Sequence, residues 1–102
     1  EMQRSLVGSE MCIRDRAAAL LKSMSHPKRL LILCMLSGSP GTSAGELTRI
    51  TGLSASATSQ HLARMRGEGL IDSQRDAQRI LYSIKNEAVN AIIATLKNVY
   101  CL

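Results

Sequence analysis

Aromatic residues are almost absent from this chain. The sequence contains no tryptophan and no phenylalanine, and its two tyrosines are Tyr82 and Tyr100. Proteins that bind single-stranded nucleic acid usually stack successive bases on aromatic side chains. Because this chain offers so few rings, we do not expect single-stranded nucleic acid to be its partner.

Long apolar runs and a cysteine framework are also missing. No apolar run reaches the length of a membrane span. Near the N-terminus only Leu6 and Val7 precede a Gly-Ser-Glu break, which is unlike a secretory signal. The three cysteines, Cys12, Cys34 and Cys101, are too few and too irregularly spaced for a secreted disulfide framework. We therefore expect a cytoplasmic protein with no membrane partner.

The usual patterns of metal sites and active sites do not occur either. There is no Cys-x-x-Cys pair, and the two histidines, His26 and His61, have no metal-ligand neighbour at helical spacing. The sequence has no Gly-rich phosphate loop, no carboxylate pair in an apolar setting and no Ser/His/Asp grouping beyond chance. We expect no metal, no cofactor and no catalytic residues, so the chain is not expected to be an enzyme.

The chain is short and basic. Its 102 residues allow one small domain, and 13 lysines and arginines against 8 acids give a formal net charge of +5. Three arginines and three acids balance within residues 1–16, so the whole excess lies in residues 17–102. A basic domain of this kind favours a polyanionic partner.

The most informative stretch is 54–70, SASATSQHLARMRGEGL. Leu62, Met65 and Leu70 give it one apolar stripe at helical spacing, and short polar side chains precede them. Short side chains let a helix approach DNA closely, hydroxyl groups bind phosphates, and Gln, His and Arg can reach base edges. The predicted DNA-binding residues of this helix are Ser54, Ser56, Thr58, Ser59, Gln60, His61 and Arg64.

The preceding segment completes a helix-turn-helix. Ser43 is a helix cap with Glu46 three residues on, which is the pattern of a capping box, and a turn is expected at Thr51-Gly52. The second helix should run from Ser54 or Ser56 to Glu68 and stop at Gly69. The sequence thus predicts a helix-turn-helix whose second helix reads DNA.

The flanking segments predict a wing and three more helices. Helical patterns occupy 17–24 and 27–38, the second capped by Ser25 or His26 with Pro27 in its first turn. Two strands are expected at 70–73 and 80–84, with a polar connection between them. The connection carries Arg75 and Arg79, which are further candidate DNA contacts. Alternatively, both are solvent-exposed charges of the turn. The expected fold class is mainly α with a small β-hairpin, a winged helix-turn-helix.

The last helix, capped by Asn86, is too apolar for a small monomer. Its stripe consists of Ala88, Val89, Ile92, Ile93, Leu96, Val99 and Tyr100. Because an exposed apolar stripe of this width is rare in monomers, a second subunit is its natural cover. We expect a homodimer that forms through the first and last helices.

Four short motifs at fixed spacing resemble a known family. They are Leu21 with Met24-Ser25-His26-Pro27-Lys28-Arg29-Leu30, Ser56-x-x-Ser59-x-His61-Leu62, Glu68-Gly69-Leu70-Ile71, and Arg79 with Tyr82. With these motifs residues 17–102 resemble the ArsR/SmtB family of dimeric winged-helix repressors, in particular its persulfide-sensing subgroup. Residues 1–16 do not fit the first helix of that family. We expect 1–16 to be a non-family segment, an artefact or a tag, and 17–102 to be the winged-helix DNA-binding domain.

The resemblance also carries an expectation about the inducer. Many relatives bind metal through a Cys-x-Cys box or through Asp and His pairs on the last helix, and here 44–47 has no cysteine and 86–102 has no histidine. The positions of Cys34 and Cys101 resemble the sensing pair of the sulfide-responsive members. In those members reactive sulfur species link the two thiols, and the repressor releases double-stranded operator DNA.

Three alternatives stay open at the level of sequence. Cys34, within an apolar helix, could be an ordinary core cysteine. The chain could instead sense haem or a metal through Cys34 or Cys101. It could also be a winged-helix module for protein contacts, although such a module would not need a second helix rich in hydroxyl groups and arginine.

Overall fold

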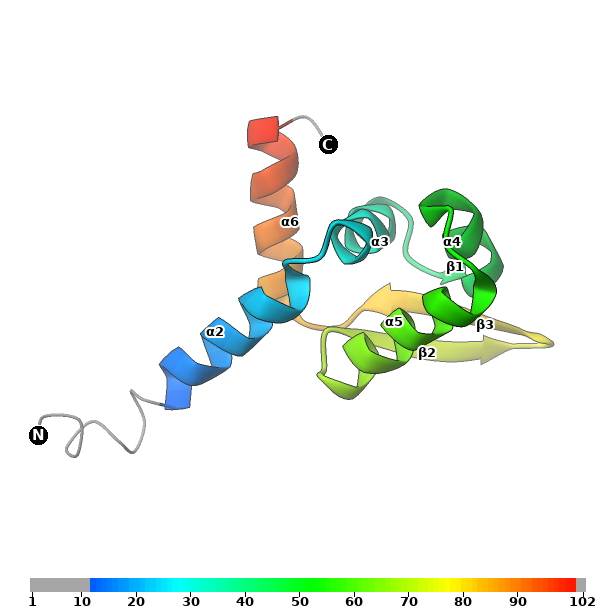
Figure 1. Ribbon diagram of the computed structural model, residues 1–102, viewed down its shortest axis with the longest axis horizontal. Coiled ribbons are helices and arrows are strands. Elements are labelled where there is room, and N and C mark those ends of the chain that lie inside the picture. The colour runs from blue at the N-terminus through cyan, green and yellow to red at the C-terminus, as the bar shows by residue number, and fades with distance from the viewer. Residues whose placement is uncertain (1–11, 101–102) are drawn as a thin grey trace, which may run out of the picture.

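The computed structural model describes residues 12–100, which form five helices and three short strands (Figure 1). The elements in chain order are α2 (Cys12–Met24), α3 (Pro27–Gly38), β1 (Thr42–Ser43), α4 (Ala44–Thr51), α5 (Ala55–Gly67), β2 (Ile71–Asp76), β3 (Arg79–Ile84) and α6 (Glu87–Tyr100). The helix-turn-helix consists of α4 and α5, and β2 and β3 form the wing. The predicted winged helix-turn-helix is therefore confirmed.

Local capping sets several of the helix boundaries. Before α3, the His26 Nδ1 atom accepts a hydrogen bond from the Lys28 N–H at 3.1 Å, and Pro27 occupies the first turn, where a missing N–H costs nothing. Before α4, the Ser43 hydroxyl accepts from the Glu46 N–H at 3.3 Å. The Glu46 carboxylate pairs with Arg49 on the same helix. The structure therefore contains the serine half of the predicted capping box, while the glutamate side chain has another partner.

The turn between α4 and α5 depends on a glycine. Gly52 has φ 72°, the left-handed conformation that favours glycine, and its N–H donates to the Thr48 carbonyl to close the last turn of α4. Ser54 then caps α5, because its hydroxyl accepts from the Ala57 N–H at 3.0 Å. These interactions fix the angle at which α5 follows α4.

The sheet has one strand more than the sequence indicated. Its order is β1-β3-β2, all antiparallel, with Thr42 opposite Tyr82 and Ile71 opposite Ile84. The wing strands are also longer than the predicted 70–73 and 80–84, and only Ala77 and Gln78 connect them. A six-residue polar loop was expected there, and the backbone instead continues in register to the pair Asp76 and Arg79.

The core lies where α3, α4, α5, the wing and α6 converge. Its fully buried apolar side chains are Met24, Ile32, Leu33, Leu36, Leu47, Leu62, Met65, Leu70, Ile71, Val89 and Ile93. Val89 and Ile93 therefore pack inside their own subunit. The expectation that both are covered by a partner subunit is wrong, because one side of α6 already faces α3 and β3.

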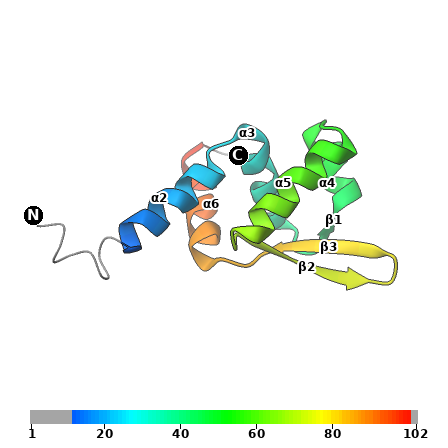
Figure 2. The same ribbon diagram turned by 60° about the horizontal axis from the view of Figure 1, so that its bottom comes forward.

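Helix α2 extends away from the rest of the molecule. Both views show it leaving the body at the end opposite the tip of the wing (Figures 1 and 2). It begins at Cys12, five residues before the predicted start at Ala17, so the expected division at 16/17 falls inside a helix. Residues 1–11 of the predicted non-family segment lie outside the described residues. Between residues 12 and 100, no helix has both the length and the apolar character needed to cross a membrane.

Candidate nucleic-acid interface

One side of α5 packs inward and the other is open. Thr58, Leu62 and Met65 follow each other at steps of four and three residues, and each is at most 1% exposed. This buried side packs on α4 and β2. The exposed residues of the opposite side and of the cap are Ser54, Ala55, Ser56, Ser59, Gln60, Ala63, Arg64 and Arg66. The structure thus presents small, hydroxyl, amide and guanidinium groups on one side of a rigid helix.

Thr58 is not part of this open surface. Its side chain is fully buried, and its hydroxyl donates to the Ser54 carbonyl at 3.0 Å. The prediction that the Thr58 side chain contacts DNA is wrong, because Thr58 precedes Leu62 by one helical turn and shares its inward direction.

His61 lies at the edge between the two sides. It is half-buried, its Nδ1 atom accepts a hydrogen bond from Arg29 Nε at 3.1 Å, and its ring centroid lies 4.7 Å from that of His26. Burial lowers the pKa of His61, and the nearby charges of Arg29, His26 and Arg64 lower it further. Since Nδ1 is an acceptor, the neutral ring carries its proton on Nε2. A DNA contact of His61 stays a prediction.

Arg29 was not predicted to take part in this region. It lines a concave surface of about 500 Å³ on α5 together with Ala57, Gln60, His61, Ala63 and Arg64. The position of Arg29, three residues after the cap His26, gave no local signal of this contact with α5. Next to it, Lys28 Nζ donates to the Thr51 carbonyl at 2.7 Å and joins α3 to the turn of the helix-turn-helix.

The two wing arginines lie on strands, close to the turn. Arg75 of β2 is opposite Ile80, and Arg79 of β3 is opposite Asp76. Opposed residues share a face of the ribbon and successive residues alternate, so the register places Arg75 and Arg79 on opposite faces. Both side chains are exposed. Arg66, at the end of α5, donates to the Ser73 hydroxyl at 2.9 Å and fixes the wing beside the helix.

Cys34 lies half-buried on α3, against the core. Burial raises the pKa of the Cys34 thiol, and the Lys97 ammonium on α6 offsets part of that rise. Because α3 packs against α6, Cys34 lies near the last turns of the chain's final helix. Cys101, the other predicted sensing residue, and the side chain of Cys12 lie outside the described residues.

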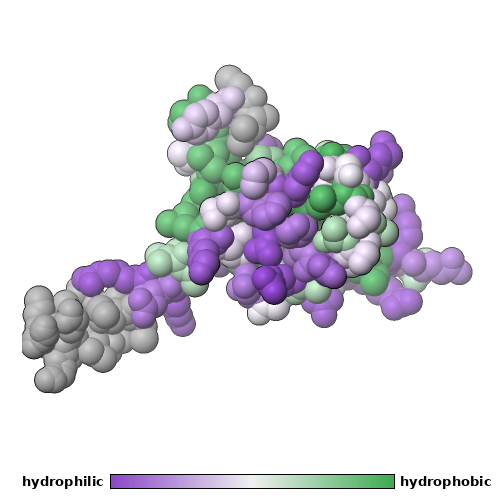
Figure 3. Space-filling view, in the orientation of Figure 1, coloured by the Kyte–Doolittle hydropathy of each residue, from purple (hydrophilic) through white to green (hydrophobic). Residues whose placement is uncertain are grey.

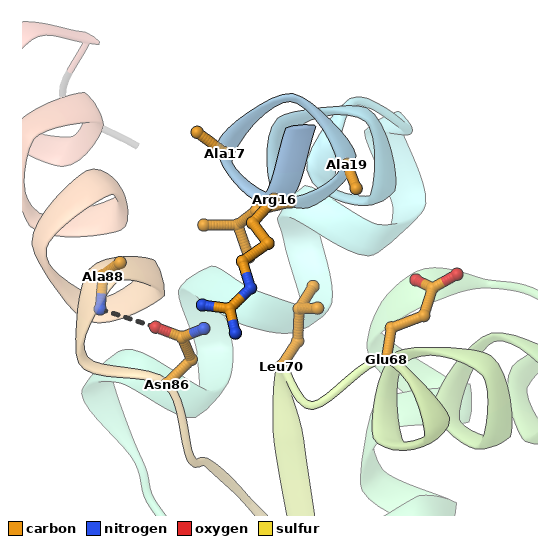
Figure 4. A pocket seen from close by; sticks show the side chains of 8 residues that line it. Arg16, Ala17, Ala19, Glu68, Leu70, Asn86 and Ala88 are labelled. Atoms are coloured by element: carbon orange, nitrogen blue, oxygen red, sulfur yellow. Dashed lines mark hydrogen bonds between the residues drawn. The ribbon is translucent and has the colours of Figure 1, made fainter. Parts of the chain in front are cut away.

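The surface and its hollows separate a polar from an apolar part of the molecule. Apolar residues gather along α6 and its junction with α2, and hydrophilic residues cover much of the central face (Figure 3). A hollow of about 550 Å³ lies between α2, the end of α5 and the start of α6, lined mainly by alanine and leucine with Arg16, Glu68 and Asn86 (Figure 4). Across residues 12–100, no three His, Cys, Asp or Glu side chains come together where they could hold a metal ion.

Two helices joined by a glycine turn, with a polar, arginine-bearing second helix and a β-hairpin beside it, define a winged helix-turn-helix transcriptional regulator. Residues 26–73 match the family model described as "Bacterial regulatory protein, arsR family". Over 87 residues, 85% of this chain and 88% of the relative, the sequence is 95% identical to the HTH-type transcriptional regulator YgaV of Escherichia coli strain K12. The protein belongs to the ArsR family of bacterial transcriptional regulators.

Other relatives agree on the fold, and one of them is named an activator. The transcriptional activator HlyU of Vibrio cholerae is 43% identical over 84% of this chain and 79% of its own. A crystal structure of a predicted DNA-binding transcriptional regulator from E. coli superposes with a TM-score of 0.82 at 91% identity, covering 88% of this chain and 95% of that one. Reduced HlyU superposes with a TM-score of 0.85 at 40% identity, covering 90% and 96%. These relatives are named as regulators, so the chain is a regulator and not an enzyme.

Proposed function

We propose that this regulator is a homodimeric repressor that binds double-stranded operator DNA and releases it when reactive sulfur species link Cys34 to Cys101. A protein that binds the chromosome acts in the cytoplasm. The observation that carries the DNA-binding part is the open side of α5. Its polar side chains are exposed on a helix that Leu62 and Met65 anchor to the core.

The roles of the α5 residues follow from their chemistry. Ser54, Ser56 and Ser59 suit phosphate contacts, which set the register of the helix on the duplex. Both Gln60 and Arg64 can reach base edges in the major groove, Arg64 with paired donors and Gln60 with one donor and one acceptor. His61 can add a contact from Nε2, since Nδ1 is already bonded to Arg29.

The wing supplies the second part of the DNA contact. Arg75 and Arg79 lie next to the turn of the hairpin, at the end of the molecule opposite α2 (Figure 2). An arginine at such a position binds phosphates or the minor groove beside the groove that the recognition helix occupies.

The dimer is supported by exposed apolar side chains on the two helices at the other end. Leu21 on α2 is 53% exposed, and Val99 and Tyr100 on α6 are 65% and 68% exposed. A twofold dimer through these helices carries two copies of α5, one for each half-site of an operator.

The sulfur chemistry balances with polysulfide as the oxidant. One cysteine thiolate attacks a sulfur atom of the polysulfide chain, forms an S–S bond and expels a shorter polysulfide anion. The second thiolate attacks the added sulfur chain, closes the bridge and expels hydrosulfide. The two thiols are oxidised, and sulfane sulfur is reduced to sulfide. Because burial raises the pKa of Cys34, we expect Cys101 to react first.

The bridge would act through helix packing. Cys34 lies on α3, which packs against α6, and α3 also packs against α4 of the helix-turn-helix. A link between α3 and the end of α6 would change how these helices sit on each other and thereby the spacing of the two recognition helices in the dimer.

The DNA-binding part is tested by titrating a labelled palindromic promoter fragment with reduced protein. Arg64→Ala should weaken specific binding by about 1–3 kcal/mol if Arg64 reads a base. Thr58→Val is the matched control, since this residue points into the core. Unchanged affinity in a variant combining Gln60→Ala, His61→Ala and Arg64→Ala would contradict the assignment of α5.

The sensing part is tested separately, by repeating the titration after polysulfide treatment and measuring intact mass. The wild type should lose DNA and gain the mass of a bridge with added sulfur, whereas Cys34→Ser and Cys101→Ser should keep DNA. If the double variant still releases DNA on polysulfide treatment, the switch lies elsewhere in the chain.

A further inference from the structure

A small hydrogen-bonded cluster joins the end of α2 to the recognition helix. At its centre, Ser23 is only 7% exposed, and its hydroxyl donates to Oε1 of Glu68, the residue that ends α5. Arg29 Nη1 donates both to the Ser23 carbonyl at 3.1 Å and to the Ser23 hydroxyl at 3.2 Å. Ser23 thus accepts hydrogen bonds from Arg29 of α3 and donates one to Glu68 at the end of α5.

Arg29 completes the cluster with a second branch. Its Nε atom donates to His61 Nδ1 at 3.1 Å, while Nη1 is held by Ser23. The planar guanidinium orients these two groups at once, which a flexible ammonium group cannot do. One side chain therefore links the last turn of α2 to the middle of α5.

The two attachment points fix α5 more strongly than one would. His61 and Glu68 are seven residues apart, which is about two helical turns and about 10 Å along the axis. A helix held at one point can still tilt about it, whereas a helix held at two points on the same side keeps its direction. Both points lead back to Ser23 and Arg29.

We propose that Arg29 is a positioning residue which, together with Ser23, transmits the orientation of α2 to the recognition helix α5 and thereby sets the affinity for DNA. This inference rests on the proposed function, because α5 is taken as the DNA-reading helix. It adds a connection between the apolar end of the molecule, which carries α2, and the end that carries α5. This connection, made by Ser23, Arg29, His61 and Glu68, is called the joint below.

The charges around the cluster support a neutral His61 as part of the joint. Arg29 and His26 face the ring from the side of α3, Arg64 faces it from α5, and the Glu68 carboxylate accepts from Ser23. Protonation of Nδ1 would remove the acceptor that Arg29 uses and would place two cations in contact. The lowered pKa of His61 agrees with this arrangement.

The first test needs no DNA. The pKa of His61 is measured by NMR titration in the full chain, as wild type, Arg29→Met, Arg29→Lys and Ser23→Ala, with Lys85→Met as a control of equal charge change outside the cluster. Arg29→Met should raise the pKa of His61, because the donor and the charge that favour the neutral ring are both removed. Lys85→Met should leave it unchanged. An unchanged pKa in Arg29→Met overturns the joint whether or not the protein binds DNA.

The second test measures coupling to DNA. Arg29→Met, Ser23→Ala and Glu68→Ala should each reduce operator affinity by roughly 2- to 30-fold, the range found for residues that couple distant parts of a protein. The Ser23→Ala/Glu68→Ala double variant should be no weaker than the weaker single variant, because both substitutions break the hydrogen bond between Ser23 and Glu68. The salt dependence of binding should stay as in the wild type.

Three further outcomes would each contradict one of the claims made here for Arg29, the joint or DNA binding. If Arg29→Met makes the salt dependence shallower by about one unit, Arg29 binds a phosphate and the positioning role is wrong. If the His61 pKa rises and operator affinity stays the same, the joint does not affect DNA reading. If the wild type binds no operator, the proposed function fails. Hydrogen exchange of the α5 amides in Ser23→Ala, compared with the wild type, then tests the joint without DNA. If Arg29→Met does not fold, Arg29→Lys and Ser23→Ala carry the same comparisons.

Discussion

The hydrogen bond between Arg29 and His61 makes the stability of the folded protein sensitive to acid. His61 accepts from Arg29, and burial together with the charges of Arg29, His26 and Arg64 lowers its pKa in the folded protein. In the unfolded chain the ring has the ordinary histidine pKa, about 6.5. Below that pH the ring is protonated in the unfolded state while it is still neutral in the folded state. The free energy of unfolding therefore falls as the pH drops toward the pKa of the folded state, and below that pKa it levels off.

We predict that His61→Gln removes this contribution. The glutamine carbonyl can still accept from Arg29 but does not titrate near neutral pH. Denaturant midpoints measured from pH 7.5 to 5 should fall less steeply in His61→Gln than in the wild type. Parallel pH profiles for the two proteins would show that His61 titrates equally in the folded and unfolded states.

At the residue scale, helical spacing alone shows which side chains of a helix are buried, but not which residues of other helices they contact. Thr58 precedes Leu62 by four residues, so the spacing that marks Leu62 as a core residue also places Thr58 inside. Its residue type suggested a DNA contact, and its position overrides that suggestion. Arg29 could not be assigned from the sequence, because its partner His61 is 32 residues away and the two side chains meet only in the folded chain.

At the scale of elements, the ends of the helices were readable because capping is local. His26 caps α3, Ser43 caps α4, and the Asn86 side chain accepts from the Ala88 N–H at 2.8 Å before α6. Strand β1 has only two residues and exists because β3 lies beside it. No pattern within two residues can indicate a strand whose partner is distant in sequence.

The turn of the wing carries a strained residue. Ala77 has φ 60°, a left-handed conformation that a side chain with a Cβ atom disfavours by roughly 1–2 kcal/mol. We predict that Ala77→Gly stabilises the protein by about 0.5–1 kcal/mol, because relief of this strain exceeds the added freedom of glycine in the unfolded chain. Chemical denaturation measures the change. The control is Ala55→Gly in the first turn of α5, an exposed position of ordinary helical conformation, which should be destabilising.

The register of the wing separates the effects of its two arginines. Since Arg75 and Arg79 lie on opposite faces of the ribbon, a duplex beside α5 cannot meet both in the same way. We predict that one of Arg75→Ala and Arg79→Ala lowers affinity for all sequences alike and makes the salt dependence shallower by about one unit, and that the other has a smaller effect. Binding curves at several salt concentrations measure this. Equal changes in both variants would show that the wing twists enough to bring both side chains to DNA.

At the scale of the whole molecule, the polar and apolar surfaces lie at different ends. Helix α5 and the wing present hydroxyl and guanidinium groups, whereas α2 and α6 carry most of the exposed large apolar side chains in the described part of the chain (Figure 3). The sequence indicated the apolar character of α6 but not which residues remain outside. Val89 and Ile93 fill the core, while Leu21 and Val99 stay exposed, because the side of α6 that meets α3 and β3 is fixed only in the folded chain.

An exposed apolar end predicts the assembly and, through symmetry, the shape of the operator. Leu21→Asp or Val99→Asp should leave the subunit folded, because both side chains are more than half exposed. Twofold symmetry brings each substitution into the interface twice, so the dimer should weaken by roughly 2–5 kcal/mol. The control is Ile80→Asp, which places the same charge on an apolar residue of the wing, 41% exposed. Sedimentation should show a dimer for the wild type and for Ile80→Asp, and a shift toward monomer for the other two, with loss of tight binding to a two-half-site operator. A wild type that sediments as a monomer at micromolar concentration and binds a single half-site as tightly as a pair would refute the dimeric repressor.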